Sequence, residues 1–183
     1  MSEILRFPVK DVEAFVVRAY EKVGISTAEA KRIAELQVRA DLIGADGHGV
    51  FRLPQYIRRI KGGAVNLTPK IRLEREAAGM GLVDGDNGMG HLVMRYAAET
   101  AIAKAKTAGV AWVGVKWSNH AGPASLYASM PLAHDMIGLY LAVGNANHLP
   151  PWGGIDMLLS TNPIAVAVPG GAEPAIVLDM ATT

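Results

Sequence analysis

The chain has 183 residues, of which half are hydrophobic and 19% are charged, so it can bury a core and is not expected to be disordered. Its formal net charge of +1 gives no reason to expect nucleic acid or an anionic membrane as a partner. The absence of cysteine excludes disulfides, thiolate metal sites and cysteine nucleophiles.

The first part of the chain predicts helices. Apolar residues recur at helical spacing over residues 11–23, and Gly24 follows where helices commonly end. Ser26 and Glu29 form a capping box, in which each residue satisfies a free backbone donor of the other. We therefore predict one helix over about residues 11–23 and a second over about residues 27–43.

A third helix is predicted over residues 50–60. Because Pro54 is tolerated only in the first turn of a helix, this helix should begin near Phe51. The Lys-Gly-Gly-Ala sequence that follows breaks the chain. We place a domain boundary there, between an N-terminal helical segment, residues 1–63, and an α/β domain, residues 64–183.

The second predicted domain alternates apolar strands with helices. A long alanine-rich stretch in it is closed by Gly109, a residue that commonly ends helices. This alternation indicates an α/β layer architecture. We predict strands over residues 71–74, 81–84, 110–115, 137–143, 164–168 and 176–179, and helices over residues 88–108 and 122–132.

The first polar cluster lies in residues 46–56, Asp-Gly-His-Gly-Val-Phe-Arg-Leu-Pro-Gln-Tyr. If a helix begins near His48, then His48, Arg52 and Tyr56 follow at four-residue spacing on one face. A histidine can transfer a proton near neutral pH, and an arginine can hold a carboxylate in two hydrogen bonds. These groups could orient and protonate a 2-oxo acid. The alternative is that His48 caps a turn and Arg52 lies on a solvated face.

The second cluster, Ser118-Asn119-His120, follows a predicted buried strand. Open α/β sheets bind ligands at the carboxyl ends of their strands, and the N-terminus of a following helix favours anions. The alternative is that Ser118 or Asn119 only caps that helix. A serine–histidine hydrolase is not favoured, because the sequence lacks a Gly-x-Ser-x-Gly elbow.

Further polar residues follow the later predicted strands. The segment 144–154, rich in Asn and Gly, suits a phosphate or ribose contact on the same edge as His120, or a plain surface loop. Residues 161–163 precede one strand and residues 179–182 end the next. Asp179 could bind a ribose hydroxyl or could only cap the segment that follows it.

Two kinds of site are not indicated by the sequence. The Gly-x-Gly-x-x-Gly fingerprint of Rossmann proteins is missing, and the nearest segment, residues 85–90, has the wrong spacing and is interpreted as a flexible loop that leads into a helix. The five histidines are scattered without the spacing of a metal site, so we expect no metal. We interpret His91 and His134 as ordinary helix residues.

Four motifs, in order, resemble the malate/L-lactate dehydrogenase family. Residues 46–56 resemble its Ser-His-Gly-Val-x-Arg-Leu-Pro-x-Tyr signature, and residues 118–122 resemble its Ser-x-His-x-Gly motif. Residues 160–163 resemble its Gly-Thr-Asn-Pro, and residues 177–182 its strand that ends in Asp-Met-Ala-Thr. Their order and spacing agree across nearly the whole chain.

The resemblance implies a homodimeric oxidoreductase with a mixed α/β cofactor-binding domain unrelated to the Rossmann fold. Such an enzyme transfers a hydride between NAD or NADP and C2 of a small 2-hydroxy or 2-oxo acid, or of a cyclic imino acid. His48 or His120 would be the acid/base residue and Arg52 a carboxylate contact. The implied cofactor contacts are Ser118, Gly144, Asn145, Asn162, Asp179, Met180, Ala181 and Thr182.

Two features depart from the family pattern. Gly47 stands where the family usually has serine, so either a hydrogen bond that orients His48 is absent or the substrate differs. The sequence stops at Thr183, whereas family members continue for about as long again, so we expect a truncated half. The alternative function is therefore a catalytically inactive half-protein that only folds and associates.

The sequence also predicts where the protein resides. Its longest apolar run, near residues 136–143, is far shorter than the roughly 20 residues that a membrane helix needs. The first residues lack the pattern of a signal peptide. We expect a cytoplasmic protein that has no membrane partner.

Overall fold

The computed structural model describes residues 5–183, so the first residues, for which we predict no signal peptide, lie outside the described part of the chain. The chain forms two compact units, Met1–Gly122 and Pro123–Thr183. The predicted domain boundary near residue 63 remains a prediction. No helix in the described residues is long and apolar enough to cross a membrane.

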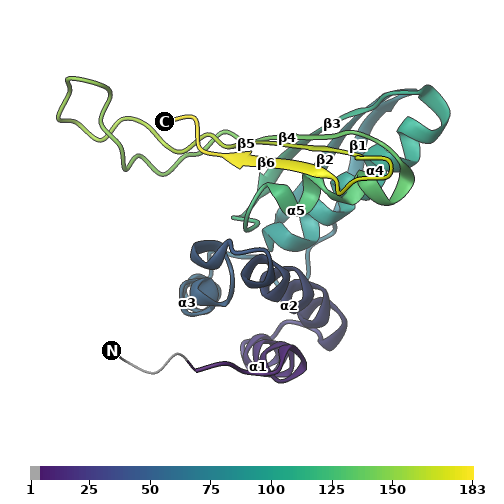
Figure 1. Cartoon of the computed structure of the whole chain (residues 1–183). Coiled ribbons are helices and arrows are strands. Elements are labelled where there is room, and N and C mark those ends of the chain that lie inside the picture. The colour runs from purple at the N-terminus through teal and green to yellow at the C-terminus, as the bar shows by residue number, and fades with distance from the viewer. Residues whose placement is uncertain (1–4) are drawn as a thin grey trace. The chain divides into compact units, whose positions relative to one another are not determined.

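Three helices open the first unit: α1 (Val9–Glu21), α2 (Thr27–Leu42) and α3 (Leu53–Lys61) (Figure 1). Half of the predicted capping box is confirmed, because the Glu29 backbone N–H donates to Ser26 Oγ at 3.4 Å. The Glu29 carboxylate accepts the Ser26 hydroxyl at 2.7 Å rather than the Ser26 backbone N–H, so one backbone donor at the start of α2 is satisfied and not two.

The predicted third helix begins later than expected. Two 3₁₀ turns, Asp46–His48 and Val50–Arg52, precede α3, and Pro54 then lies in the first turn of α3. The position of the proline agrees with its lack of a backbone N–H. The three helices bury a common core that includes Val16, Tyr20, Ala30, Ile33, Ala34, Val38, Leu53, Tyr56 and Ile60.

A three-stranded sheet completes the first unit. Strand β1 (Arg72–Ala77) pairs antiparallel with β2 (Met80–Gly88), and β2 pairs in parallel with β3 (Trp112–Ser118). Helix α4 (Gly90–Ala108) connects the two parallel strands and packs on the sheet (Figure 1). The helix ends, as predicted, at Gly109, whose φ of 81° is a left-handed conformation suited to glycine.

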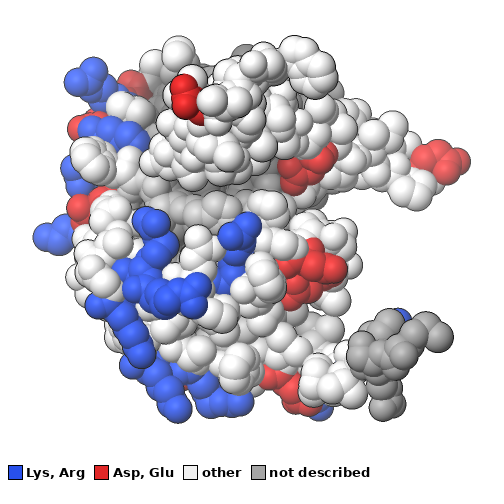
Figure 2. Space-filling view, turned by 90° about the vertical axis from the view of Figure 1, so that its left-hand side faces the viewer, with Lys and Arg blue, Asp and Glu red and all other residues white. Residues whose placement is uncertain are grey.

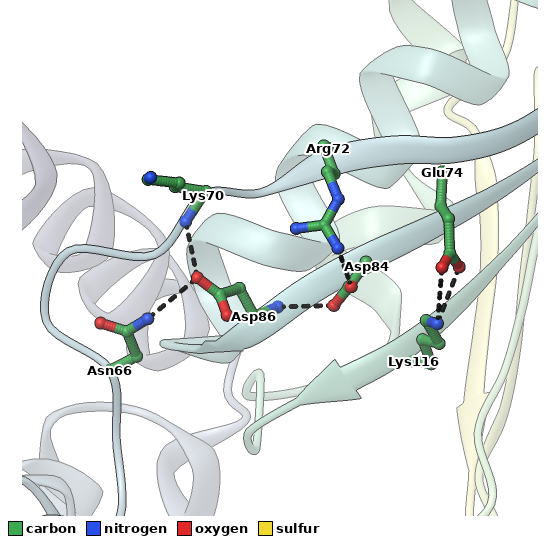
Figure 3. Close-up of polar contacts among 7 residues, drawn as sticks. All are labelled: Asn66, Lys70, Arg72, Glu74, Asp84, Asp86 and Lys116. Atoms are coloured by element: carbon green, nitrogen blue, oxygen red, sulfur yellow. Dashed lines mark hydrogen bonds and ion pairs between the residues drawn. The ribbon is translucent and has the colours of Figure 1, made fainter.

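The end of β2 is an ordered structure, so the prediction of a flexible loop over residues 85–90 is wrong. Buried Asp84 accepts a 2.6 Å bond from Arg72 and a 3.0 Å bond from the Asp86 backbone N–H (Figure 3). Asp86 in turn accepts bonds from Asn66 and from the Lys70 backbone N–H (Figure 3). These bonds hold a backbone that bends through positive φ angles, which explains why glycine spacing alone was misleading.

The second unit contains an antiparallel sheet of β4 (Gly138–Leu141), β5 (Ile164–Val168) and β6 (Ile176–Met180), in that order. Its short helix α5 (Ser125–Ala128) and a 3₁₀ turn (Met130–His134) replace the single helix predicted over residues 122–132.

The two faces of this second sheet differ. Ala165 and Ala167 point to one face, where they pack with Ala124 and Ala128 and are fully buried. Because side chains alternate along a strand, the register places only apolar residues on the opposite face. That open apolar face consists of Leu139, Leu141, Ile164, Val166, Val168, Ile176, Leu178 and Met180.

Candidate active site

A chain of buried hydrogen bonds supports the segment that carries His48. The Tyr20 hydroxyl of α1 donates to Gln37 Oε1 at 2.9 Å, and Gln37 Nε2 of α2 donates to the Gly49 carbonyl at 3.0 Å. Both the tyrosine and the glutamine are fully buried. The backbone beside His48 is therefore fixed by two helices, because a buried polar group that loses its partner is costly.

Asp41 supports the same segment from α2. Its carboxylate accepts the Val50 backbone N–H at 3.0 Å, and a Cβ built on Gly49 would lie 1.8 Å from Asp41 Oδ1. Only glycine leaves room for this carboxylate. Burial raises the pKa of Asp41, while the hydrogen bond from Val50 opposes that rise.

Hydrogen bonds of the Asn119 side chain hold the loop that carries His120 in place. Its Nδ2 donates to the Asn87 carbonyl at 2.9 Å and to the Gly88 carbonyl at 3.0 Å, and its Oδ1 accepts a bond from Arg59 at 3.0 Å. A Cβ on Gly90 would lie 2.1 Å from the Asn119 carbonyl oxygen, so the start of α4 also presses on this loop. The bent end of β2 and the first turn of α4 thus determine where His120 lies.

The alternative in which Ser118 or Asn119 only caps a helix is wrong. Ser118 Oγ donates to the neighbouring Asn119 carbonyl at 3.0 Å, and α5 does not begin until Ser125.

The two predicted site histidines lie together in the first unit. The rings of His48 and His120 stack with their centroids 5.6 Å apart and their planes 18° apart. The Tyr56 hydroxyl lies 2.6 Å from His120 Nδ1, and the ring of Tyr56 meets the edge of His91 at 5.4 Å between centroids. The 3₁₀ turns, α3, α4 and the loop after β3 therefore each contribute a side chain to one cluster.

Arg52 also belongs to this cluster. Its Nε donates to the Gly47 carbonyl at 2.7 Å and its Nη1 to Gln55 Oε1 at 2.8 Å. Among the ion pairs of the described residues, none includes Arg52 or Arg59. Basic side chains also gather on part of the surface in Figure 2. Guanidinium groups without a carboxylate partner are suited to bind an anionic ligand.

The cluster favours neutral imidazoles. Burial, followed by the charges on His48, Arg52 and Arg59, lowers the pKa of His120 to about 4. Burial, followed by the charge on His120, lowers the pKa of His91 to about 3. Part of the His120 side chain remains accessible to solvent, so a ligand can reach it. A neutral histidine next to two arginines can contact an anion without adding positive charge.

The second unit brings together three of the predicted cofactor contacts. The Gly144 backbone N–H donates to Asn162 Oδ1 at 2.9 Å, and the Thr182 hydroxyl donates to the Asn162 carbonyl at 3.0 Å. Asn145 and Ala181 lie next to these residues in the chain and are exposed. Most of the segment 144–154 is likewise exposed loop, and its predicted place on the same edge as His120 remains a prediction.

Asp179 caps a helix that precedes it in the chain, whereas the expected cap was for the segment that follows it. Its Oδ2 accepts the backbone N–H of Ser125, the first residue of α5, at 2.8 Å. Burial, followed by the charge on Asp179, raises the pKa of the nearby Tyr140 to about 12. Met180, the next residue of β6, points to the open apolar face and is 47% exposed.

The sequence profile of the family described as malate/L-lactate dehydrogenase matches residues 7–183. The chain belongs to the malate/L-lactate dehydrogenase family. The resemblance of the four motifs is thereby confirmed.

The proteins similar to this chain are named for several different activities. Malate dehydrogenase of Pyrococcus horikoshii is 43% identical over 98% of this chain and 49% of its own length. Ureidoglycolate dehydrogenase (NAD(+)) of Escherichia coli K12 is 32% identical over 88% of this chain and 46% of its own length. The Delta(1)-pyrroline-2-carboxylate/Delta(1)-piperideine-2-carboxylate reductase of Pseudomonas putida is 31% identical over all of this chain and 53% of its own length.

The fold is also that of the malate/L-lactate dehydrogenase family. The solved structure of the Pyrococcus horikoshii malate dehydrogenase matches with a TM-score of 0.91 over 98% of this chain and 51% of that chain. The predicted fold class, helices followed by a mixed α/β part, is confirmed. The chain spans about half the length of the relatives that it matches.

Two residues of the candidate site, Arg59 and His91, were missed from the sequence, and Tyr56 was named in the first cluster without a role of its own. Tyr56 shares the helical spacing of His48 and Arg52, and that spacing was the available signal. No sequence pattern pointed to Arg59 or His91. The role of Arg59 depends on its contact with Asn119, and the role of His91 depends on its burial against Tyr56. No group of three or more His, Cys, Asp or Glu side chains in the described part of the chain could hold a metal ion.

Proposed function

We propose that this chain carries the acid/base half of an oxidoreductase that transfers a hydride between NAD(P) and C2 of a small 2-hydroxy or 2-oxo acid, or of a cyclic imino acid. The stacked His48–His120 pair beside Arg52 is the observation that carries this proposal. Family membership supports it, since relatives include dehydrogenases and an imine reductase.

The residues of the first unit suit both directions of such a reaction. Arg52 would hold the substrate carboxylate, which fixes C2 next to the histidines. In oxidation, one histidine takes the hydroxyl proton while the C2–O bond becomes a carbonyl. In reduction, the same histidine returns a proton to the oxygen, or to the nitrogen of an imine. Bound NAD(P) would accept or supply the hydride.

We propose cofactor contacts at the residues that the resemblance to the family implies. The donor set suits a dinucleotide, because exposed hydroxyl, amide and carboxylate groups can bind ribose and amide oxygens. Asp179 uses one carboxylate oxygen on Ser125, which leaves the other oxygen for a ribose hydroxyl. The proposed contacts are Ser118, Gly144, Asn145, Asn162, Asp179, Met180, Ala181 and Thr182.

Turnover by the purified chain tests this function. NADH or NADPH oxidation is followed by absorbance with pyruvate, oxaloacetate, 2-oxoglutarate or piperideine-2-carboxylate as the second substrate. We expect turnover with at least one pair, and a loss of about 100-fold or more in His48→Ala and in His120→Ala. Arg52→Lys should mainly raise KM for the acid, because lysine lacks the two-pronged contact. A folded chain that turns over no pair would contradict the proposal.

The second candidate is a catalytically inactive half-protein that folds and associates with a second copy of itself. The open apolar face of the β4–β6 sheet favours it, because an exposed apolar patch of this kind commonly marks an interface. Sedimentation that shows a concentration-dependent dimer, without turnover, would support this candidate, whereas an active chain would exclude it. A dimer that is active would instead fit a homodimeric oxidoreductase.

A further inference from the structure

The hydroxyl of Tyr56 contacts a ring nitrogen of His120. The phenol oxygen lies 2.6 Å from His120 Nδ1, and the Tyr56 side chain is only 4% exposed. Tyr56 projects from α3, whereas His120 follows β3, so one hydrogen bond joins the two motifs of the candidate site.

We propose that Tyr56 is a positioning residue that fixes His120 as the neutral imidazole with its proton on Nε2. In this form His120 donates a hydrogen bond to the oxygen or nitrogen on C2 of the substrate and does not take up its proton. The inference rests on the proposed function, and it distinguishes between two histidines that the sequence left equivalent.

The direction of the hydrogen bond follows from two neighbours of Nδ1. The Gly122 backbone N–H points at Nδ1 from 3.4 Å, and a backbone N–H can only donate. Burial raises the pKa of Tyr56, so its phenol stays protonated and can donate as well. With two donors directed at it, Nδ1 must be the acceptor. The single proton of the neutral ring then lies on Nε2.

The charged and titratable groups around His120 also oppose a second proton on its ring. His48 and Arg52 face it from the 3₁₀ turns, and Arg59 faces it from α3. All three lower the pKa of His120, and burial lowers it more than any of them. A neutral imidazole that donates from Nε2 can polarise a carbonyl oxygen without first being protonated.

This arrangement leaves proton transfer to His48. His120 cannot accept the hydroxyl proton on Nε2, because that atom already carries one, and Nδ1 is turned toward Tyr56 and Gly122. His48 stacks on His120 with its centroid 5.6 Å away, so a second imidazole lies beside His120 to take the proton. In oxidation the hydroxyl proton moves to His48, and bound NAD(P) would accept the hydride from C2. In reduction both transfers run backward.

His91 also packs against the ring of Tyr56. The two rings meet edge to face, with their planes 88° apart. His91 is fully buried, and its two ring nitrogens have no hydrogen-bond partner within the described residues. The contact therefore holds the phenol ring without competing for its hydroxyl, which is left to His120.

The tautomer can be measured without substrate. In the purified chain labelled with ¹⁵N-histidine, long-range ¹H–¹⁵N correlation spectra at neutral pH distinguish a protonated ring nitrogen from an unprotonated one. We expect His120, assigned from the spectrum of His120→Gln, to show a protonated Nε2 and an unprotonated Nδ1 at neutral pH. A proton on Nδ1, or an even mixture of the two forms, would overturn the inference whatever the turnover.

Tyr56→Phe tests whether the hydroxyl is the cause. It removes one oxygen atom and keeps the buried ring, and circular dichroism checks that the variant is folded. We expect the ¹⁵N shifts of His120 to move toward a mixture of tautomers, and kcat to fall about tenfold with little change in KM. Tyr96→Phe, which removes a partly exposed hydroxyl from α4, is the matched control and should leave the shifts unchanged. Unchanged shifts in folded Tyr56→Phe would contradict the role of Tyr56.

Kinetics separate this inference from the proposed function. His120→Gln keeps an N–H donor near the position of Nε2, so its kcat should fall only about tenfold, whereas His120→Leu should lose about 100-fold or more. Both should keep the pH profile of kcat/KM, and His48→Gln should lose the limb that reports the acid/base residue. Loss of that limb in His120→Gln would overturn the inference and leave the function standing. A chain without turnover that shows the expected tautomer would contradict the function and leave the role of Tyr56 standing.

Discussion

At the scale of single residues, the candidate site depends on how closely backbone approaches side chains. Gly47 and Gly49 flank His48 in the sequence, yet their surroundings differ. A Cβ on Gly49 would lie 1.8 Å from Asp41 Oδ1, whereas a Cβ on Gly47 would have no heavy atom within 4 Å. A serine at position 47, where the resemblance to the family leads us to expect one, would therefore fit without steric conflict.

Gly49→Ala should destabilise the first unit, because the new methyl group displaces Asp41 and breaks its bond to the Val50 backbone N–H. We expect a loss of about 1–3 kcal/mol in the free energy of unfolding, measured by urea titration. Gly47→Ala is the matched control and should change the stability by less than about 1 kcal/mol. Equal losses in the two variants would show that Asp41 does not restrict this position.

At the scale of elements, sequence patterns located most helices and strands of the fold. Local backbone chemistry determines the hydrophobic periodicity, the capping box of Ser26 and the closing Gly109. A short stretch of sequence is therefore enough to predict each of these features. The helix predicted over residues 122–132 was wrong because Pro131 lacks a backbone N–H and falls in a 3₁₀ turn instead. The bend at the end of β2 was missed because it depends on Asn66, a residue far away in the sequence.

The candidate site was predicted only in part for the same physical reason. His48, Arg52 and His120 were found from short motifs, and the structure brings them together. The role of His91 could not be read from its position near the start of a helix, because it depends on burial beside Tyr56. Because His91 is buried, it should also make the stability of the first unit depend on pH.

His91 should make the first unit sensitive to acid. Its folded pKa of about 3 lies below the ordinary value of 6.5, so below about pH 6.5 the unfolded chain binds more protons than the folded chain. Stability should therefore be retained above about pH 6.5 and fall toward pH 3, with a slope of up to about 1.4 kcal/mol per pH unit for this one histidine. Urea unfolding between about pH 7 and pH 4 measures the slope.

Two variants isolate the contribution of His91. His91→Leu should flatten the slope, and it should cost little stability at neutral pH because the ring nitrogens form no hydrogen bond within the described residues. Val93→Ala, at another buried position of α4, should lower the stability by a similar amount at every pH. An unchanged slope in His91→Leu would assign the acid sensitivity to other groups.

At the scale of the whole molecule, the sheet of the second unit leaves one of its two apolar faces exposed. Its strands alternate in the usual way, but apolar side chains occupy both faces, and only the face that carries Ala165 and Ala167 is covered by α5. Apolar side chains on both faces are typical of a sheet that is buried on both sides. The fold of this unit therefore leaves one face suited to a second copy of the chain.

Leu178→Lys and Val177→Lys test whether that face mediates association. The two residues are neighbours on β6 with similar exposure, 47% and 46%, but Leu178 pairs with Val166 on the open apolar face and Val177 pairs with Ala167 on the other. Burying a lysine without a partner is costly, so Leu178→Lys should raise the dimer dissociation constant by at least about tenfold in sedimentation equilibrium. Val177→Lys should leave it nearly unchanged. Equal weakening by both variants would indicate a general effect of charge, and a wild-type chain that stays monomeric at high concentration would show that this face does not bind a second copy.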